Sequence, residues 1–154
     1  MRPARCAARL EKQRYVRRRF TVVNRPEPPT TAKTILICED DSNLRTLVRL
    51  ALGQGYNFLE APDGYVAMEL LRRTEPDLIV LDLMLPGRSG LELLGEIRRV
   101  AGHERTPVIV ISAWAHSDTA AVAAGADRFV AKPFDPRDLH DAVVDLLEGN
   151  GSQR

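Results

Sequence analysis

The sequence predicts a doubly wound α/β fold, in which helices cover both faces of a parallel sheet. Four short runs are apolar on nearly every residue, which is typical of parallel strands buried on both faces; they are residues 35–38, 78–81, 108–111 and 129–131. A weaker strand is predicted for residues 57–61. Segments with helical apolar spacing separate the strands, so the chain forms five strand–helix units.

The helices are predicted from apolar side chains that recur every three or four residues. The stripes are Leu44, Leu47, Val48 and Ala51 after Ser42; Ala67, Leu70 and Leu71 after Asp63; Leu94, Ile97 and Ala101 after Ser89; and Leu139, Ala142, Val143, Leu146 and Leu147 after Asp135. The last helix also has start and stop signals: Asp135 as N-cap, Pro136 at the first helical position, and Gly149 after the last periodic residue. A shorter, alanine-rich helix is predicted for residues 117–124.

The net charge of +1 hides a division along the chain of 154 residues. Residues 1–33 hold ten Lys or Arg and two acids, whereas residues 34–154 hold twelve bases and nineteen acids. The first segment also has Pro26, Pro28 and Pro29 and little apolar periodicity. We therefore expect a disordered basic tail or linker over 1–33, one domain over 34–150, and a short C-terminal tail over 151–154. The arginine-rich tail could contact nucleic acid, but a solvated tail or a start codon assigned too far upstream is the favoured interpretation.

Export and membrane insertion are not expected. No apolar run approaches the roughly 18 residues of a membrane span, and the arginines at 17–19 are not followed by the apolar stretch of an export signal. Cys6 and Cys38 predict no disulfide framework, and Cys38 lies within an apolar run. The sequence therefore predicts a cytoplasmic protein with no membrane partner.

Functional groups in a doubly wound sheet gather beyond the carboxyl ends of its strands. Four of the five predicted strands end in a group able to bind metal or phosphate: Glu39, Asp40 and Asp41 after the first, Asp82 after the third, Ser112 after the fourth, and Lys132 after the fifth. The carboxylates of Glu39, Asp40 and Asp82 would repel one another in one crevice unless cations were present. Lys132 supplies one positive charge, and the remaining charge of about −2 matches Mg²⁺, which prefers hard oxygen ligands. One carboxylate could then attack a phosphorus centre, and Ser112 could donate a hydrogen bond to the bound phosphoryl group.

Four motifs in order give these residues a family resemblance. They are ILICEDD at 35–41, DLIVLDLMLPGRSG at 77–90, PVIVISA at 107–113 and GADRFVAKPF at 125–134. With them, the segment from Thr34 to about Gly149 resembles the receiver domain of bacterial two-component response regulators. The resemblance implies a flavodoxin-like fold, a five-stranded parallel sheet in the order 2-1-3-4-5.

The resemblance also implies a role for each site residue. Asp82 is the expected phosphoacceptor. The expected Mg²⁺ ligands are Glu39, Asp40, Asp82 and the backbone carbonyl of Met84. We expect the phosphoryl group to contact Ser112 and Lys132, and the switch to consist of Ser112 and Phe129. The peptide bond between Lys132 and Pro133 is expected to be cis. Met84 and Trp114 occupy the two positions thought to tune dephosphorylation in this family, and because neither easily orients a hydrolytic water, a long-lived phosphoryl group is expected.

The function implied is that of a stand-alone phosphoacceptor response regulator. It would take its phosphoryl group from a sensor histidine kinase or a histidine phosphotransfer protein, change its surface for a downstream protein target, and catalyse no reaction besides its own phosphorylation and dephosphorylation. A phosphorelay intermediate and a pseudo-receiver that is never phosphorylated are the alternatives. A phosphatase with an aspartyl nucleophile is disfavoured because position 84 is methionine rather than a second acid.

The three histidines have no spacing typical of metal ligands. They are His103, His116 and His140, and we predict that they are surface residues.

Overall fold

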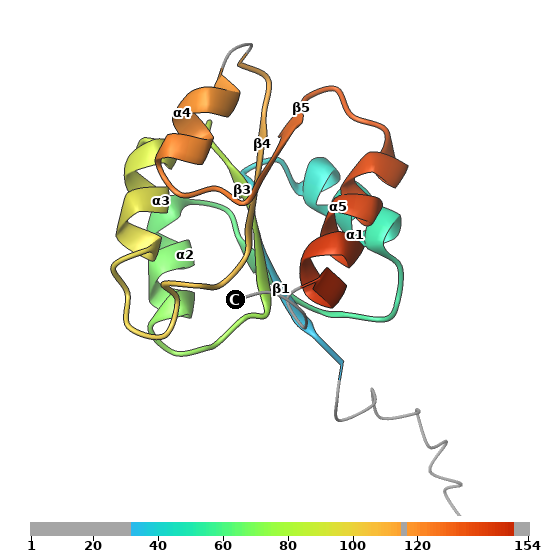
Figure 1. Ribbon diagram of the computed structural model, residues 1–154, viewed down its shortest axis with the longest axis horizontal. Coiled ribbons are helices and arrows are strands. Elements are labelled where there is room, and N and C mark those ends of the chain that lie inside the picture. The colour runs from blue at the N-terminus through green and yellow to red at the C-terminus, as the bar shows by residue number, and fades with distance from the viewer. Residues whose placement is uncertain (1–31, 115–116, 150–154) are drawn as a thin grey trace, which may run out of the picture. The chain divides into compact units, whose positions relative to one another are not determined.

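The computed structural model describes residues 32–114 and 117–149. The prediction of a disordered tail over 1–33 falls almost entirely outside these residues. The elements follow the predicted alternation and are, in chain order, β1 (Thr34–Cys38), α1 (Ser42–Leu52), β2 (Asn57–Ala61), α2 (Gly64–Leu71), β3 (Leu78–Asp82), α3 (Gly90–Ile97), β4 (Val108–Ser112), α4 (Ser117–Ala123), β5 (Arg128–Ala131) and α5 (Pro136–Gly149). Figure 1 shows them in one α/β unit.

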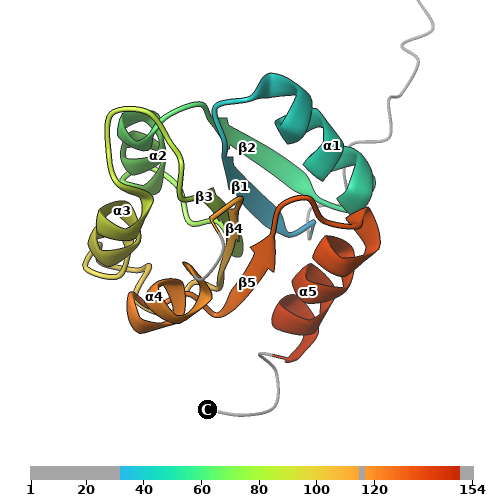
Figure 2. The same ribbon diagram turned by 90° about the horizontal axis from the view of Figure 1, so that it is seen from above.

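The five strands form one parallel sheet in the order β2-β1-β3-β4-β5, as the resemblance implied. The register pairs Cys38 with Leu81, and Ser112 with Ala131, so the strands end at nearly the same level. Helices α1 and α5 cover one face of the sheet, and α2, α3 and α4 cover the other (Figures 1 and 2). This arrangement confirms the flavodoxin-like fold.

Two apolar cores lie on opposite faces of the sheet, because successive side chains of a strand point to opposite sides. Leu36, Ile79 and Val110 contribute to the core under α2, α3 and α4, whereas Ile35, Val80 and Ile109 contribute to the core under α1 and α5. All six side chains are fully buried. The continuous apolar runs of the sequence are therefore explained by burial on both faces.

Carboxylates and one glycine fix the loops at the carboxyl ends of the strands. Asp41 accepts hydrogen bonds from the N–H groups of Asn43 and Leu44 and caps α1, and Asp63 caps α2 in the same way. Gly90 begins α3 against the backbone of Leu83, where a Cβ atom would lie 2.3 Å from the Leu83 Cα. Only glycine permits this approach, which holds the loop that follows Asp82 against the sheet.

Three sequence predictions need correction. His103 is buried, not at the surface, because its Nε2 lies 2.8 Å from the Leu71 carbonyl oxygen and its Nδ1 lies 3.3 Å from the Thr106 hydroxyl. Ala101 is exposed and lies beyond α3, which ends at Ile97. Helix α4 ends one residue earlier than predicted, at Ala123. His140 is partly exposed, and His116 lies outside the described residues.

No helix among the described residues is both long enough and apolar enough to cross a membrane.

Candidate functional site

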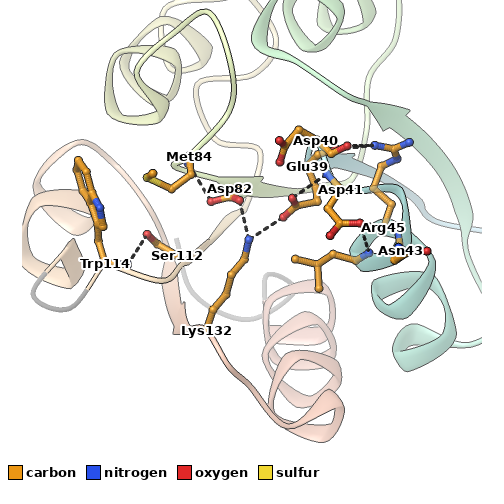
Figure 3. A network of polar contacts seen from close by, with 11 residues as sticks. Glu39, Asp40, Asp41, Asn43, Arg45, Asp82, Met84, Ser112, Trp114 and Lys132 are labelled. Atoms are coloured by element: carbon orange, nitrogen blue, oxygen red, sulfur yellow. Dashed lines mark hydrogen bonds and ion pairs between the residues drawn. The ribbon is translucent and has the colours of Figure 1, made fainter.

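The carboxyl ends of four strands bring the predicted site residues together. Strands β1 and β3 are neighbours, so Glu39 and Asp82 face each other at their ends. Lys132 follows β5 and reaches both carboxylates: its Nζ lies 2.8 Å from Glu39 Oε2 and 2.6 Å from Asp82 Oδ2 (Figure 3). The side chains of Glu39 and Asp82 are only 2% and 3% exposed, and that of Lys132 is 19% exposed. Two buried carboxylates therefore share one ammonium group.

Asp40 adds a third carboxylate, and its side chain is exposed. One oxygen from each of Glu39, Asp40 and Asp82 can be chosen so that all three lie within 4.8 Å of one another. Three hard anionic donors, in a group with no His or Cys, match the ligand preference of Mg²⁺ rather than that of zinc. The donor set therefore fits a hard divalent cation such as Mg²⁺.

The two oxygens of Asp82 have different partners. Oδ1 accepts a hydrogen bond from the N–H of Met84 at 2.9 Å, whereas Oδ2 accepts one from Lys132. Both bonds hold the carboxylate in one orientation at the end of β3. The carboxylate is thus positioned before any ligand arrives.

Burial and mutual repulsion disturb the acid–base properties of the cluster. The pKa of Glu39 is raised to about 7, because burial and, to a smaller extent, the negative charge of Asp82 outweigh the hydrogen bonds from Lys132 and the Asp41 N–H, which lower it. Burial opposes the charge on Lys132, but its hydrogen bonds to Asp82 and Glu39 outweigh burial and raise its pKa. Lys132 therefore stays charged, and the excess negative charge falls on the carboxylates.

The hydroxyl and the aromatic side chain of the predicted switch lie on adjacent strands. Ser112 ends β4 and is buried, and its Oγ accepts a hydrogen bond from the Trp114 N–H at 3.1 Å. Phe129 is half-buried on β5, opposite Val110 in the register, and packs against the core under α2, α3 and α4. The peptide bond between Lys132 and Pro133 is cis, as expected.

Met84 and Trp114 border the site on its open side. Their side chains are 50% and 58% exposed, and Figure 3 shows both beside Asp82 and Ser112 rather than packed in the core. Their backbone N–H groups bond to Asp82 and Ser112, respectively, so the position of each side chain is tied to a site residue.

Sequence reasoning missed Arg45, on the first turn of α1. Its Nη1 lies 2.7 Å from the carbonyl oxygen of Glu39 and 3.2 Å from that of Asp40, directly behind the acidic pair. A cation in the first turn of a helix is unfavourable beside the positive end of the helix dipole. That unfavourable position is the one sign in the sequence that Arg45 bonds to a group outside its own helix.

Comparison with known proteins gives consistent matches. The family model described as the response regulator receiver domain matches residues 35–144. The phosphate regulon transcriptional regulatory protein PhoB of Pseudomonas aeruginosa is 39% identical over 122 residues, which cover 77% of this chain and 53% of that protein. A CheY-like response regulator receiver domain protein from Methanospirillum hungatei matches at 25% identity and a TM-score of 0.72, over 79% of this chain and 98% of that one. The phosphorylated cyanobacterial phytochrome response regulator RcpA matches at 26% identity and a TM-score of 0.67, over 77% and 95% of the two chains. The chain spans about half the length of the curated relatives it matches.

Proposed function

Because the chain belongs to the response regulator receiver domain family of two-component systems, we propose that it accepts a phosphoryl group on Asp82 from a phosphohistidine. The observation that carries the proposal is the buried Asp82 carboxylate, held by Lys132 and by the Met84 N–H at the open edge of the sheet. The donor is a sensor histidine kinase or a histidine phosphotransfer protein. The recipient of the signal is a downstream protein that recognises the changed surface.

The transfer exchanges one bond to phosphorus for another. An Asp82 oxygen attacks the phosphorus, the P–N bond of the donor breaks, and its electron pair remains on the imidazole nitrogen. Because the other ring nitrogen of the phosphohistidine carries a proton, the ring leaves as neutral imidazole. Lys132, which is already 2.6 Å from Asp82, stabilises the oxygens of the phosphoryl group. Mg²⁺ held by Glu39, Asp40, Asp82 and the Met84 carbonyl would supply the positive charge that offsets carboxylate repulsion.

Ser112 and Phe129 couple the phosphoryl group to the surface. The Ser112 hydroxyl ends β4, the strand beside that of Asp82, and can donate a hydrogen bond; on phosphorylation it moves toward the new oxygens. Phe129, half-buried on the adjacent strand, then moves inward with it. Lys132→Ala would accept phosphate slowly but lose most of this switch.

Met84 and Trp114 lengthen the lifetime of the phosphoryl group. A thioether is only a weak acceptor and an indole offers only an N–H donor, so neither orients a water for in-line attack. Their exposed side chains instead shield the acyl phosphate. A Met84→Asn and Trp114→Glu double variant should lose phosphate faster than wild type. An unchanged rate would assign the lifetime to another feature of the site.

Phosphoramidate tests the acceptor role without a cognate kinase, because it carries the same P–N bond as phosphohistidine. The full chain incubated with phosphoramidate and Mg²⁺ should gain one phosphoryl group by intact mass spectrometry, and Asp82→Asn should gain none. Asp63→Asn is the matched control, because Asp63 lies at the same edge of the sheet but only caps α2, and asparagine also caps helices. Labelling of Asp82→Asn at the wild-type rate would show that another residue is the acceptor, and a wild type that never labels would favour the pseudo-receiver.

A further inference from the structure

The turn that carries the acidic pair leaves the sheet after one last strand hydrogen bond. The Glu39 N–H donates to the Ala61 carbonyl of β2 at 3.1 Å, and the chain then turns toward α1. The Glu39 side chain is buried but that of Asp40 is exposed, so sheet pairing and core packing do not fix the position of Asp40. Another contact must hold the peptide groups of this turn.

Arg45 makes that contact. Its guanidinium reaches back from α1, and Nη1 donates to the Glu39 carbonyl at 2.7 Å and to the Asp40 carbonyl at 3.2 Å (Figure 3). The side chain of Arg45 is only 15% exposed, so water does not readily replace these bonds. Because both carbonyls belong to the residues of the acidic pair, the guanidinium fixes the peptide planes from which the two carboxylates project.

Glu60 on β2 in turn holds the guanidinium. Its Oε2 accepts from Arg45 Nε at 2.8 Å, while its Oε1 lies 2.9 Å from Arg49 Nη1. The planar guanidinium offers Nε to the carboxylate and Nη1 to the carbonyls at the same time. A lysine has one point of charge on a flexible stem and cannot keep this geometry, although it keeps the charge.

These contacts give Arg45 a geometric role, which a lysine of the same charge cannot fill. Glu60 offsets the positive charge of Arg45 only in part, because the same carboxylate also pairs with Arg49. Arg49 offers the comparison, because it pairs with the same carboxylate one turn further along α1 but has no hydrogen bond to Glu39 or Asp40.

We propose that Arg45, anchored by Glu60, is a positioning residue that sets the separation of the Glu39 and Asp40 carboxylates and so tunes their affinity for a divalent cation. The inference rests on the proposed function, because it assumes that these carboxylates bind Mg²⁺. It extends the site from the edge of β1 and β3 to β2, which contributes no metal ligand.

Mg²⁺ titration of the full chain by calorimetry tests this role with no phosphorylation step. Partners that orient metal ligands typically change affinity 10–100-fold when they are lost. Arg45→Lys should therefore raise the Kd for Mg²⁺ about tenfold, and Arg49→Gln, the matched control, should change it less than about twofold. Glu60→Gln keeps Arg45 but weakens its anchor, so its Kd for Mg²⁺ should lie between those of the other two variants. It replaces Arg45→Lys as the test if that variant does not fold.

Hydrogen exchange of the Asp41 amide in the metal-free protein gives a second measurement. This N–H donates to Glu39 Oε1 at 3.1 Å, so it reports on the turn directly. The exchange rate of this amide should rise in Arg45→Lys and stay the same in Arg49→Gln.

Each outcome decides one of the two proposals. Unaltered Mg²⁺ affinity in Arg45→Lys, or an equal loss in Arg49→Gln, would overturn the positioning role. A wild type that binds no Mg²⁺ would instead overturn the metal site of the proposed function, and exchange of the Asp41 amide would then decide whether Arg45 holds the turn.

Discussion

The two ends of the sheet both carry half-buried ion pairs, but they differ in charge balance. At the carboxyl ends of the strands, Lys132 is shared by Glu39 and Asp82, so two carboxylates compete for one cation. At the amino ends, Arg98 pairs with Asp127 one to one, with a distance of 2.8 Å between Nη2 and Oδ2. The comparison teaches that burial of charge alone does not mark a functional site. Here the candidate functional site is the end of the sheet where carboxylates outnumber the cations that pair with them.

The amino-end network closes on itself. Arg98 also donates to the carbonyls of Gly125, Thr106 and His103, and Asp127 accepts from the Val108 N–H at 2.9 Å. Among the described residues, no buried side-chain nitrogen or oxygen lacks a hydrogen-bond partner. The amino end therefore joins the loops before β4 and β5 with its charges balanced, whereas the carboxyl end keeps excess negative charge.

Removing the shared cation should have the largest effect. Lys132→Met keeps an apolar stem but leaves two buried carboxylates facing each other, so the free energy of unfolding at pH 8 without Mg²⁺ should fall by about 3 kcal/mol. The loss should shrink at pH 5 or with Mg²⁺, because a proton or a cation replaces the ammonium charge. Urea denaturation followed by far-UV circular dichroism measures it. Lys33→Met is the control, because Lys33 forms an exposed pair with Asp77, and it should change stability by less than about 0.5 kcal/mol. If Lys132→Met lost the same stability at pH 8, at pH 5 and with Mg²⁺, the charge argument would be refuted.

Arg98→Ala should be next in size. It leaves the carbonyls of Gly125 and Thr106 and one Asp127 oxygen with fewer partners, which should cost about 2 kcal/mol. Carbonyl groups do not titrate in this range, so the loss should not depend on Mg²⁺ or on pH between 5 and 8. The same urea titrations measure it, with Arg99→Ala, an exposed neighbour, as control. A loss that Mg²⁺ restores would mean that the two ends are coupled.

The pH dependence of stability should identify the unbalanced end. The folded-state pKa of Glu39, about 7, lies above its ordinary value of 4.5, so the folded protein holds this proton more tightly than the unfolded chain does. The contribution of Glu39 to the stability of the metal-free protein should therefore be full below about pH 4.5 and fall as the pH rises toward 7, by on the order of 1 kcal/mol. Glu39→Gln should flatten this window, whereas Glu92→Gln on exposed α3 surface should not. An identical slope in wild type and Glu39→Gln would exclude Glu39 as its source.

Asp77 at the amino end should show the smallest effect and the opposite sign. Partial burial opposes its charge, but hydrogen bonds from Lys33 and the Thr34 N–H outweigh burial and hold its pKa below the ordinary 3.8. Its contribution is therefore full above pH 3.8 and lost as the pH falls through its folded-state pKa. Because the pair is largely exposed, Asp77→Asn should lower stability by no more than about 0.5 kcal/mol at pH 6, and by less at pH 2. Thermal melts at both pH values measure the difference, and a larger effect at pH 2 would reverse the assigned sign.

The sequence by itself determined the five strand–helix units and the residues at the strand ends. Continuous apolar runs such as 78–81 can be stable only between two layers of helices, and a helix begins where Asp41 or Asp63 can cap it; both are local properties of the chain. Glu39, Asp82 and Lys132 could be chosen from the sequence because each directly follows an apolar strand.

Only the tertiary structure decided which of these charges meet and which residues support them. Lys132 lies 93 positions from Glu39 in the sequence, yet their charged groups bond across the sheet because β1, β3, β4 and β5 are laid side by side. Arg45 was missed and His103 was wrongly predicted to be a surface residue for the same reason. An arginine in a helix and a histidine in a loop have no periodic signal for a carbonyl partner that folding alone brings near. Local patterns determine where backbone elements begin and end, whereas long-range side-chain hydrogen bonds depend on contacts that exist only once those elements have packed.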